Sequence, residues 1–554
     1  MAARPGPLAR LPRLLRTVRW LKPTQVLGRL RFRLQRFEPD ARAAPPRRQA
    51  GGAWVSPAAR EPSLVSATGM HFLDEEQRLE EVGWDDPALP LLWRYNQHYF
   101  DDLNATDATR RHAWHVALVG RWLKDNPAGR GTAYAPYPVS LRVVNWVKWF
   151  AGGVEPEQPW LDSLALQARW LRRRLEWHLL GNHLFANAKA LVYAGLFFEG
   201  AEAEAWLATG LAIVQRELPE QILADGGHFE RSPMYHALAL EDVLDLLNAI
   251  AAWAPPGHPA AAFAHALRQR ASAMLCWLRC LRHPDGTLAR FNDCAEGLAP
   301  PHAEIERYAA ALGIAADDPP TGDALVRLEP SGYVRVQRGP ATALLDVAPI
   351  GPDYLPGHAH ADTLSFELSL GRRRLIVNRG TSVYGDGLRR QLERGTAAHS
   401  TVQLGTQDSS EVWAGFRVGR RARPGPLYID DWSIEGSHDG YTHLRGRPRH
   451  HRRWHFDAQA LAVSDRIEPV PHEAALARFH LAPGLNLVAE ATADGSRWQV
   501  HDNGALLAEI EVEGGGAFVE HWDHAERFGR LVPATTLAVP LRAGRSTVHW
   551  RWTS

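Results

Sequence analysis

The chain has 554 residues, of which 63 are Lys or Arg and 62 are Asp or Glu, and its formal net charge is +1. Apolar residues make up 45% and charged residues 23%, a globular composition that excludes collagen-like and intrinsically disordered chains. This length predicts two or more domains rather than one core. The sequence contains no window of about 18 uninterrupted apolar residues, so we expect no transmembrane helix.

The near-zero net charge hides a basic N-terminal segment. Residues 1–50 hold 13 basic residues against Glu38 and Asp40, which leaves the rest of the chain mildly acidic. The segment lacks the apolar stretch of about 7 to 15 residues that a secretory signal requires, so we expect a cytoplasmic protein. Its arginine-rich amphipathic pattern is also typical of a transit peptide or an interfacial helix. We favour a basic face folded onto the acidic body.

The periodicity of the apolar residues changes near the middle of the chain. Between about residues 60 and 325 they recur at helical spacing between Gly, Pro and Asn residues, which predicts a succession of antiparallel helical hairpins. After Pro319 and Pro320, segments such as TLSFELSL alternate apolar and polar residues, which predicts antiparallel sheet. The predicted fold class is therefore α+β with segregated helices and strands, and we expect the boundary between residues 315 and 330.

Several common functional motifs are absent from the sequence. It contains no GxGxxG, GxxxxGKS, GxxxxGKT or GxSxG pattern, which disfavours nucleotide cofactors and the serine-hydrolase elbow. The arginine pairs are not interleaved with aromatic residues, so we expect no nucleic-acid partner. Cys276, Cys280 and Cys294 are too few for a disulfide framework, and we assign them no function.

The first of three chemically rich segments is GHAHAD at residues 357–362, directly before the predicted strand TLSFELSL. If this backbone is extended, His358 and His360 project to the same side. The two imidazoles could then face one substrate site or one metal ion. Two ordinary surface histidines are the alternative in a chain with 26 histidines.

The other two segments lie in the helical half. In GNHLFAN, residues 181–187, Asn182 and His183 could hydrogen-bond an anionic group, although an Asn at a helix start is most often a cap. Residues 225–236 place charges, His and Tyr on a Gly/Pro-broken stretch before a helix. Tyr235 there is a catalytic candidate, or a core residue whose hydroxyl bonds to backbone.

At these segments the sequence resembles the heparinase II/III family of polysaccharide lyases and the related alginate lyases. The matching motifs are GNHLFANAKALVYAGL, ERSPMYH about fifty residues later, and GHAHADTLSFELSLGRRRLIVNRGTSVYG with TAAHSTVQL downstream. The segments RTVRWLKPTQVLGRLRFRL, RYNQHYFDDLNA and YPVSLRVVNWVKW also resemble the family's helical portion. The resemblance covers most of the chain and weakens after about residue 425.

The resemblance implies an incomplete (α/α) toroid packed against an antiparallel β-sandwich, with the substrate between them. It divides the chain into a basic N-terminal segment over residues 1–60, the toroid over 61–325 and the sandwich over 326–554. The implied reaction is β-elimination at a hexuronic acid, which breaks the bond at C4 and leaves an unsaturated uronate. The implied partner is an acidic polysaccharide or oligosaccharide.

The resemblance also implies catalytic roles. Asn182 and His183 match the positions that neutralise the uronate carboxylate while negative charge builds up during removal of the C5 proton. Tyr235 matches the acid, and also the base if both proton transfers occur on one face of the sugar. His358 matches the base if the two transfers occur on opposite faces. The sequence leaves both geometries open.

Two further residues of the third segment are candidates for substrate binding. Arg231 precedes Tyr235 by four residues, and His236 follows it directly. A guanidinium suits recognition of a substrate carboxylate. A structural ion pair of Arg231 with Glu230 or a neighbouring acid is the alternative.

A structural zinc is the one metal that the resemblance implies. His360 and His399 match two of its ligands, but the chain has Asn378 after the strand LIV, where the family usually has Asp. Loss of the negative ligand weakens zinc binding, so we expect no required cofactor. Zinc would otherwise need another acid, such as Asp362, and water beside the two histidines.

Two other functions stay open beside the lyase. A noncatalytic or biosynthesis-associated glycan-binding protein of the same fold is suggested by the lack of a secretory signal, because a lyase that degrades external polymers should be exported. A glycoside hydrolase on a similar toroid would use two carboxylates, such as Asp225 and Glu230. Family analogy would place the protein in the cell envelope or periplasm rather than the cytoplasm.

Overall fold

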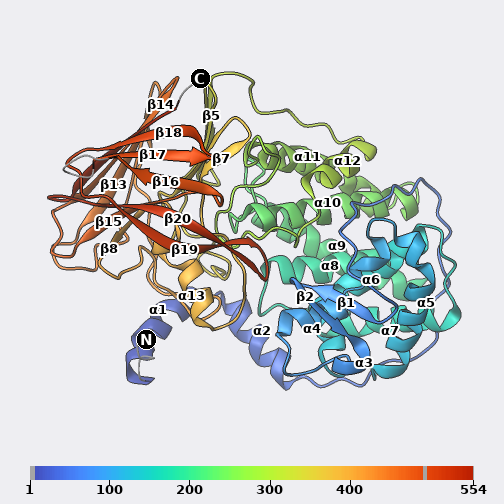
Figure 1. Cartoon of the computed structure of the whole chain (residues 1–554). Helices are drawn as coiled ribbons and strands as arrows, with labels where there is room; N and C mark the ends of the chain where they lie inside the picture. The colour runs from blue at the N-terminus through green and yellow to red at the C-terminus, as the bar shows by residue number, and fades with distance from the viewer. Residues whose placement is uncertain (1–6, 491–495, 553–554) are drawn as a thin grey trace.

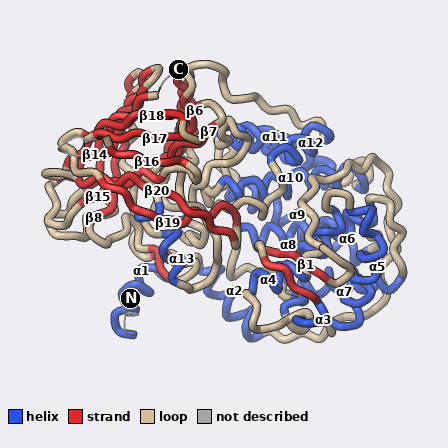
Figure 2. The backbone as a smooth tube through the Cα atoms, viewed as in Figure 1, coloured by secondary structure: helices blue, strands red, loops and turns tan. Residues whose placement is uncertain are grey.

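Helices and strands are segregated along the chain. The computed structural model describes residues 7–490 and 496–552. Figures 1 and 2 show a region built mainly of helices beside a region built mainly of strands. The first region ends with α12 (His302–Ala311), and the second begins with β3 (Ala324–Leu328). The predicted fold class, helices followed by antiparallel sheets, is confirmed.

The helical region contains long helices, short 3₁₀ turns and one small hairpin. Its other helices are α1 (Pro7–Val18), α2 (Pro23–Leu34), α3 (Leu79–Val82), α4 (Leu91–Gln97), α5 (His112–Asp125), α6 (Pro136–Ala151), α7 (Gln158–Arg173), α8 (Gly181–Phe197), α9 (Ala201–Gln221), α10 (Pro233–Trp253) and α11 (Pro259–Cys280). The 3₁₀ turns are η1 (Asp101–Asn104), η2 (Ala108–Arg111) and η3 (Thr132–Tyr134), and the hairpin pairs β1 (Gly69–Phe72) with β2 (Glu75–Arg78). No helix within the described residues is long and apolar enough to cross a membrane.

Helix α8 lies at the centre of the helical region. Nearly all of its residues are buried, and it packs against α6, α9 and α10. A helix that is apolar on every side, as in AKALVYAGLF, is stable only when it is enclosed in this way. Two glycines allow α8 and α9 to approach closely. A Cβ on Gly195 would lie 2.5 Å from the Leu207 nitrogen, and one on Gly210 would lie 2.7 Å from the Ala188 oxygen.

Three antiparallel sheets make up most of the second region. The five-stranded sheet has the order β3, β4 (Tyr333–Arg338), β5 (Ala341–Asp346), β6 (Phe366–Leu370), β7 (Arg373–Ile376). The eight-stranded sheet has the order β11 (Tyr428–Asp430), β12 (Ser433–His438), β13 (Arg449–Asp457), β14 (Ala460–Glu468), β21 (Arg545–Arg551), β18 (Ala505–Val512), β17 (Arg497–Asp502), β16 (Leu485–Ala489). The four-stranded sheet has the order β19 (Phe518–Arg527), β20 (Arg530–Pro540), β15 (Ala475–His480), β8 (Val402–Leu404).

Shorter elements lie between these strands. Helix α13 (Leu388–Arg394) and the turn η4 (Thr396–Ala398) follow β7, and β9 (Val412–Trp413) pairs with β10 (Arg417–Val418). The five-stranded sheet lies between the other sheets and the helices. Every residue of β5 and β6 is buried, because both sides of the sheet are covered. One side contributes to the core of the second region. On the other side, Tyr333 and Leu344 pack against Trp277 of α11. This sheet therefore joins the two regions.

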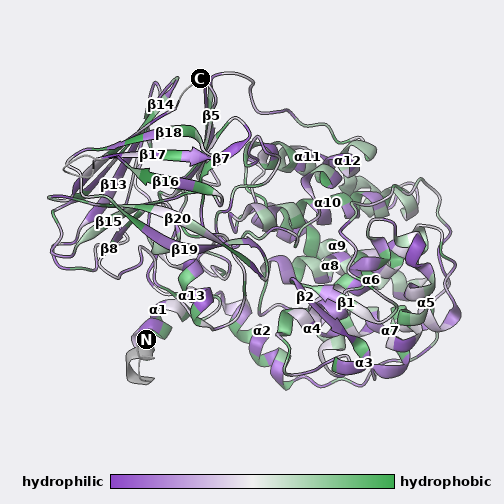
Figure 3. Cartoon of the chain, viewed as in Figure 1, coloured by the Kyte–Doolittle hydropathy of each residue, from purple (hydrophilic) through white to green (hydrophobic). Residues whose placement is uncertain are grey.

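The N-terminal segment spans both regions. Its arginines Arg13 and Arg16 contact Glu411 beside β9, and the Arg48 amide donates to the Phe197 carbonyl at the end of α8. The predicted folding of a basic face onto the body is confirmed for Arg13 and Arg16. Figure 3 shows hydrophobic and hydrophilic residues on α2 at the lower edge of the molecule.

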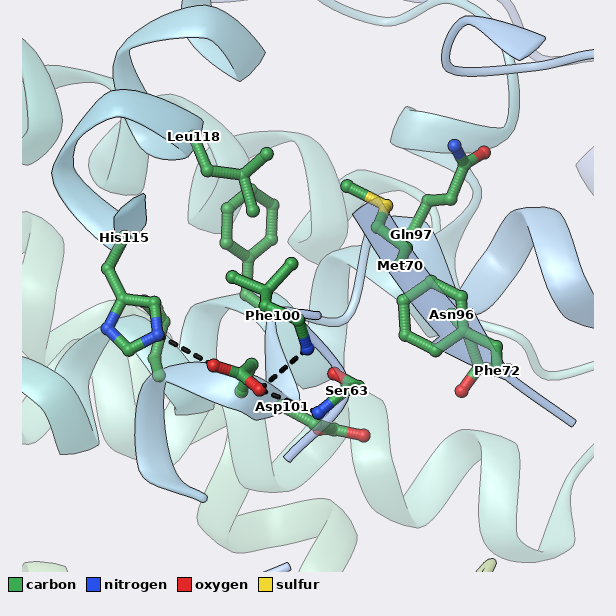
Figure 4. A pocket seen from close by; sticks show the side chains of 12 residues that line it. Ser63, Met70, Phe72, Asn96, Gln97, Phe100, Asp101, His115 and Leu118 are labelled. Carbon is green, nitrogen blue, oxygen red and sulfur yellow. Dashed lines mark hydrogen bonds and ion pairs between the residues drawn. The ribbon is translucent and has the colours of Figure 1, made fainter. Parts of the chain in front are cut away.

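A small pocket in the helical region has a structural explanation (Figure 4). Apolar residues such as Leu64 and Met70 line it. His115 donates or accepts through Nε2 at 2.7 Å from the Asp102 carboxylate, whose other oxygen accepts the backbone N–H groups of Ser63 and Leu64. The Asp102 carboxylate at this pocket therefore anchors the segment before β1.

Arg452 in β13 is one of the fully buried charged residues of the sandwich. Its guanidinium is fully buried and donates two hydrogen bonds of 2.8 Å to Asp465. A third nitrogen donates to the backbone carbonyls of Leu364 and Ser400. Because strand side chains alternate between faces, the next residue, Arg453, is exposed.

We expect Arg452→Ala to lower the free energy of unfolding by about 3 kcal/mol or more, because Asp465 would stay buried without its counter-charge. The matched control Arg453→Ala should cost less than about 1 kcal/mol, as exposed charged groups usually do. Denaturant unfolding followed by circular dichroism measures both changes. Similar losses for the two variants would contradict this account of the sandwich.

Candidate active site

Tyr235 occupies a rigid position in the first turn of α10. Ser232 caps this helix: its hydroxyl accepts the Tyr235 N–H at 3.2 Å and donates to the Asp293 carbonyl at 2.5 Å. Pro233 follows at the first helical position, where its missing N–H costs nothing. The segment SPMY therefore has two roles: it starts the helix and it orients Tyr235.

The Tyr235 ring stacks on the His358 ring, with centroids 3.8 Å apart and an interplanar angle of 16°. The Tyr235 hydroxyl lies 3.0 Å from the Tyr384 hydroxyl. The three residues come from α10, the loop between β5 and β6, and the loop between β7 and α13. Burial and the neighbouring Tyr384 raise the pKa of Tyr235 well above its ordinary value. The helical region and the sheet region thus meet at the Tyr235 side chain, whose phenol is protonated.

His358 is paired with a buried carboxylate. Its Nδ1 is hydrogen-bonded to Oε2 of Glu230. Burial opposes ionisation of Glu230, but His358 and the nearby His228 outweigh it, so the pKa of Glu230 is lowered. An ionised Glu230 accepts a hydrogen bond from Nδ1–H of His358, which leaves the lone pair of the imidazole on Nε2.

Asn182 and His183 lie in the first turn of α8, after a sharp turn with positive φ at Leu180 and Gly181. A Cβ on Gly181 would lie 3.5 Å from Oε1 of Glu230, so this helix start adjoins the Glu230 and His358 pair. The Asn182 side chain is half-buried and makes no hydrogen bond within residues 7–490 and 496–552. Leu180 is the N-cap, so the alternative of Asn182 as a cap is wrong.

His183 is held between an aromatic ring and an acid. It packs on Tyr137 with ring centroids 4.5 Å apart, and its Nδ1 lies 3.2 Å from the Glu176 carboxylate. Burial opposes the charged imidazole, but Glu176 and Glu230 outweigh it, and the pKa of His183 is raised. His183 therefore keeps its positive charge to a higher pH than a free histidine.

The structure corrects the prediction for His236, whereas substrate binding by Arg231 stays a prediction. His236 is fully buried, its Nδ1 accepts the His228 N–H, and its Nε2 bonds the Met274 carbonyl, so it has no free nitrogen for a substrate. Arg231 donates to the carbonyls of Ser331 and Phe229. The bond to Ser331 joins the segment before α10 to the turn between β3 and β4. The alternative ion pair with Glu230 is also wrong, since Glu230 bonds His358 instead.

Asp293 connects these parts, and the sequence analysis did not find it. Its N–H donates to the His358 carbonyl at 2.9 Å, and its carboxylate bonds Nε2 of His360 at 2.8 Å and both terminal nitrogens of Arg390. Although burial opposes ionisation, Arg390 and His360 hold the pKa of Asp293 far below its usual range.

Glu176 and Tyr384 were also not predicted as site residues. An acid five residues before the GNH motif is a signal for Glu176, because a charged histidine needs a counter-charge. Tyr384 lies in the quoted motif NRGTSVYG, but nothing in its spacing indicates a contact with Tyr235, 149 residues away. The partner of Asp293, Arg390, is 97 residues away.

The residues implied as zinc ligands do lie together. The rings of His360 and His399 have centroids 5.3 Å apart. Nδ1 of His360, both ring nitrogens of His399 and Nδ2 of Asn378 are buried without a hydrogen-bond partner. Each of the two imidazoles thus has a nitrogen available to bind zinc, as a zinc site requires.

The donor set nevertheless lacks a negative ligand. Asn378 supplies a neutral amide whose oxygen accepts the Ser400 N–H at 3.2 Å, and Asp362 already accepts the Asn292 N–H. Burial, His360 and the nearby Arg379 together lower the pKa of His399 well below its ordinary value. The described residues contain no group of three or more His, Cys, Asp or Glu side chains arranged for a metal. These residues do not fit a structural zinc, and we assign no step to one.

Two family models match the chain. The model described as Heparinase II/III N-terminus matches residues 104–309, and the one described as Heparinase II/III-like, C-terminal matches residues 320–553. The chain belongs to the heparinase II/III-like family. Together the models cover the GNHLFANAKALVYAGL, ERSPMYH, GHAHAD and TAAHSTVQL motifs, and the family predicted from the sequence is confirmed.

Individual members of the family differ in name. FtsZ-localized protein C of Caulobacter vibrioides is 28% identical over 407 residues, which are 66% of this chain and 65% of that protein. A heparin-sulfate lyase of Bacteroides thetaiotaomicron is 25% identical over 337 residues, 53% of this chain and 48% of that enzyme. The chain therefore spans about half the length of this lyase.

A solved structure supports the fold. The heparan sulfate lyase HepC mutant from Pedobacter heparinus matches with a TM-score of 0.57 at 20% identity, over 84% of this chain and 78% of that one. At this identity the match shows a shared toroid and β-sandwich fold and nothing about the reaction. The architecture predicted from the resemblance is confirmed.

We expect the purified protein to contain well below one zinc ion per chain, because the donor set lacks an anionic ligand. Asn378→Asp should restore this ligand and raise the zinc content toward one. Elemental analysis after dialysis measures both. One tightly held zinc per chain in the unaltered protein would contradict the assignment.

Proposed function

We propose that the protein is a polysaccharide lyase that cleaves a uronate-containing acidic glycan by β-elimination. The stack of Tyr235 on His358, with Glu230 behind the histidine, carries this proposal, because it combines a proton donor and an oriented base. Asn182 and His183 adjoin the pair and supply hydrogen-bond donors. Membership of the heparinase II/III-like family supports the reaction class.

The first requirement of the reaction is stabilisation of negative charge. Removal of the C5 proton pushes charge onto the adjacent carboxylate, and donors placed there stabilise the enolate-like state. The Asn182 amide has no hydrogen-bond partner among the residues that the structure describes. The raised pKa of His183 keeps its imidazole charged to a higher pH than that of a free histidine, and the charge is lost as pH rises through the raised pKa. Both groups would bind the uronate carboxylate.

The second requirement is a base and an acid. With Nδ1 of His358 bonded to Glu230, Nε2 is free to take the C5 proton. Tyr235 has a strongly raised pKa and is therefore protonated, which suits donation to the departing C4 oxygen and disfavours a tyrosinate base. We therefore assign His358 as the base and Tyr235 as the acid, and no metal takes part in either step.

A panel of uronate-containing polysaccharides tests the reaction class. Elimination creates a double bond conjugated with the carboxylate, so we expect the ultraviolet absorbance of an unsaturated uronate to appear with at least one polymer of the panel. Hydrolysis gives reducing ends without this absorbance. A complete lack of product with every polymer would overturn the lyase proposal.

Tyr235→Phe should lower turnover by about a hundredfold or more, because it removes only the hydroxyl that donates the proton. Tyr354→Phe is a matched control, since the Tyr354 hydroxyl bonds Glu220 rather than a residue of the proposed set. The rate of absorbance increase measures both variants. Equal activity of the two would exclude Tyr235 as the acid.

Glu230→Gln should lower kcat by about a hundredfold or more and change KM little, because the amide no longer selects the His358 tautomer with a free Nε2. Glu220→Gln, which alters a partly exposed carboxylate, is the control. Steady-state kinetics with the substrate from the panel separates kcat from KM. An unchanged kcat, or a loss confined to KM, would contradict the role of Glu230 in positioning His358.

A noncatalytic glycan-binding protein is the second candidate. One observation favours it: the relative that aligns over 66% of this chain is named for localization with FtsZ and not as a lyase. Binding of an acidic glycan without product, unchanged by Tyr235→Phe and by His358→Ala, would support this candidate. The hydrolase alternative has less support, because both oxygens of Asp225 already accept hydrogen bonds from Gly227 and Ser331.

A further inference from the structure

Helix α1 is attached to the body of the protein through its polar side. Arg16 donates to both oxygens of Glu411, at 2.8 and 2.7 Å, and Trp413 Nε1 donates to the Thr17 hydroxyl at 3.1 Å. After the helix, the guanidinium of Arg421 lies 4.8 Å from the centroid of Trp20. Amphipathic helices usually bury their apolar side. In α1 the charged side faces inward instead.

Helix α2 also faces the body with residues that are not aliphatic. Gln25 is buried, and its amide donates to the Tyr354 carbonyl at 3.2 Å. A Cβ on Gly28 would lie 3.0 Å from the His178 nitrogen, so the α2 backbone rests directly on residues 177–178. Phe32 packs on the His178 ring at 4.4 Å between centroids. The aliphatic side of α2 therefore faces away.

The outward sides of α1 and α2 are apolar and exposed. Of the 21 large hydrophobic residues that are exposed in the described chain, nine fall in this segment. They are Leu11, Leu14, Leu15, Val18, Leu21, Val26, Leu27, Leu30 and Leu34. On α2, Leu27 is 66% and Leu34 is 71% exposed. At helical spacing such residues form an apolar stripe along the helix surface. Exposed apolar stripes of this kind usually bind another protein or a membrane.

Arginines without counter-charges flank the stripe on α2. Arg29, Arg31, Arg33 and Arg36 are exposed, and none forms an ion pair with a residue of the described ranges. Arg29, Arg31 and Arg33 are spaced two residues apart in RLRFRL, and helical residues two apart project about 200° apart, so these arginines emerge on both sides of the stripe. The surface is therefore apolar along its middle and positively charged at its edges.

A pocket beside α2 adds further cations. Arg31 lines it together with Arg172, Arg173 and Arg174 at the C-terminal end of α7. A helix C-terminus attracts cations, which accounts for part of this arrangement. No carboxylate of the described residues pairs with any of the four guanidiniums. Forked donors around one hollow suit the phosphate of a lipid head group.

We propose that α1 and α2 bind the surface of an anionic phospholipid bilayer. The leucine stripe enters the boundary of the acyl chains, and the flanking arginines bind the head-group phosphates. Helices with leucine on one side and arginine at its edges lie in the membrane interface in this way. A second copy of the chain would satisfy the apolar stripe but would bring like charges together. An anionic bilayer satisfies both features.

The opposite, body-facing side of α2 adjoins the candidate active site. The Gln25 side chain of α2 bonds Tyr354, and the next residue, Leu355, lies where a Cβ on Gly181 would be, directly before Asn182. Membrane binding would hold the site close to the bilayer, where it could meet an acidic glycan attached there. This last step rests on the proposed function, whereas lipid binding itself does not.

Sedimentation of the full chain with vesicles tests the proposal. We expect binding to vesicles in which about one third of the lipid is phosphatidylglycerol, and at least about tenfold weaker binding to pure phosphatidylcholine or at high salt. Equal binding to both kinds of vesicle, or no binding to the anionic ones, would overturn it. Glycan turnover is measured separately, so failure of the lyase proposal would not affect this result.

Two variants identify the surface. Leu27→Ser with Leu30→Ser should weaken vesicle binding at least about tenfold, since it removes the middle of the stripe. Val470→Ser with Val488→Ser, at exposed apolar positions of the sheet region, should leave binding unchanged. Replacement of Arg29, Arg31, Arg33 and Arg36 by Gln provides a second, independent variant and should abolish the preference for anionic lipid.

Light scattering without lipid distinguishes a bilayer from a second copy of the chain. A monodisperse mass unchanged by Leu27→Ser with Leu30→Ser supports the bilayer. A dimer that this variant dissociates would show that the stripe is a self-association surface and would overturn the proposal. Melting curves that match the unaltered protein confirm that the variants are folded.

Discussion

The ion pair between Asp293 and Arg390 is the interaction on which the site depends. Both groups are fully buried, where an unpaired carboxylate would be very unfavourable, so each requires the other. The backbone of Asp293 accepts the Ser232 hydroxyl and donates to His358. The helix cap that orients Tyr235 and the loop that carries His358 are therefore attached to one residue. These two attachments to Asp293 hold Tyr235 of the helical half against His358 of the sheet half.

Charge is distributed locally rather than across the whole molecule. The body is mildly acidic, which disfavours long-range attraction of a polyanion, so capture of an acidic glycan would depend on close donors such as Asn182 and His183. The positive charge that the chain does concentrate lies on α1, α2 and the end of α7. That segment combines cations with exposed leucines, a combination suited to a charged interface and not to a soluble sugar alone.

Some site residues could be predicted and others could not, for physical reasons. Tyr235 and His358 lie in contiguous motifs that the family resemblance identifies. His236 lies beside Tyr235 in the same motif, yet a helix turns adjacent side chains about 100° apart, and this one points into the core. The zinc prediction depended on a single position, Asn378. The structure adds that no other acid among residues 7–490 and 496–552 takes the place of the missing aspartate.

The sequence by itself determined the order of helices and strands, the basic amphipathic segment and the family, because these follow from local periodicity and contiguous motifs. Only the tertiary structure decided which polar groups are paired. Asp293 meets Arg390 across 97 residues, and Arg16 meets Glu411 across 395. Pairing at such distances depends on how the sheets and helices pack, and periodicity carries no information about it. For the same reason only the structure showed that the leucine side of α1 and α2 faces outward.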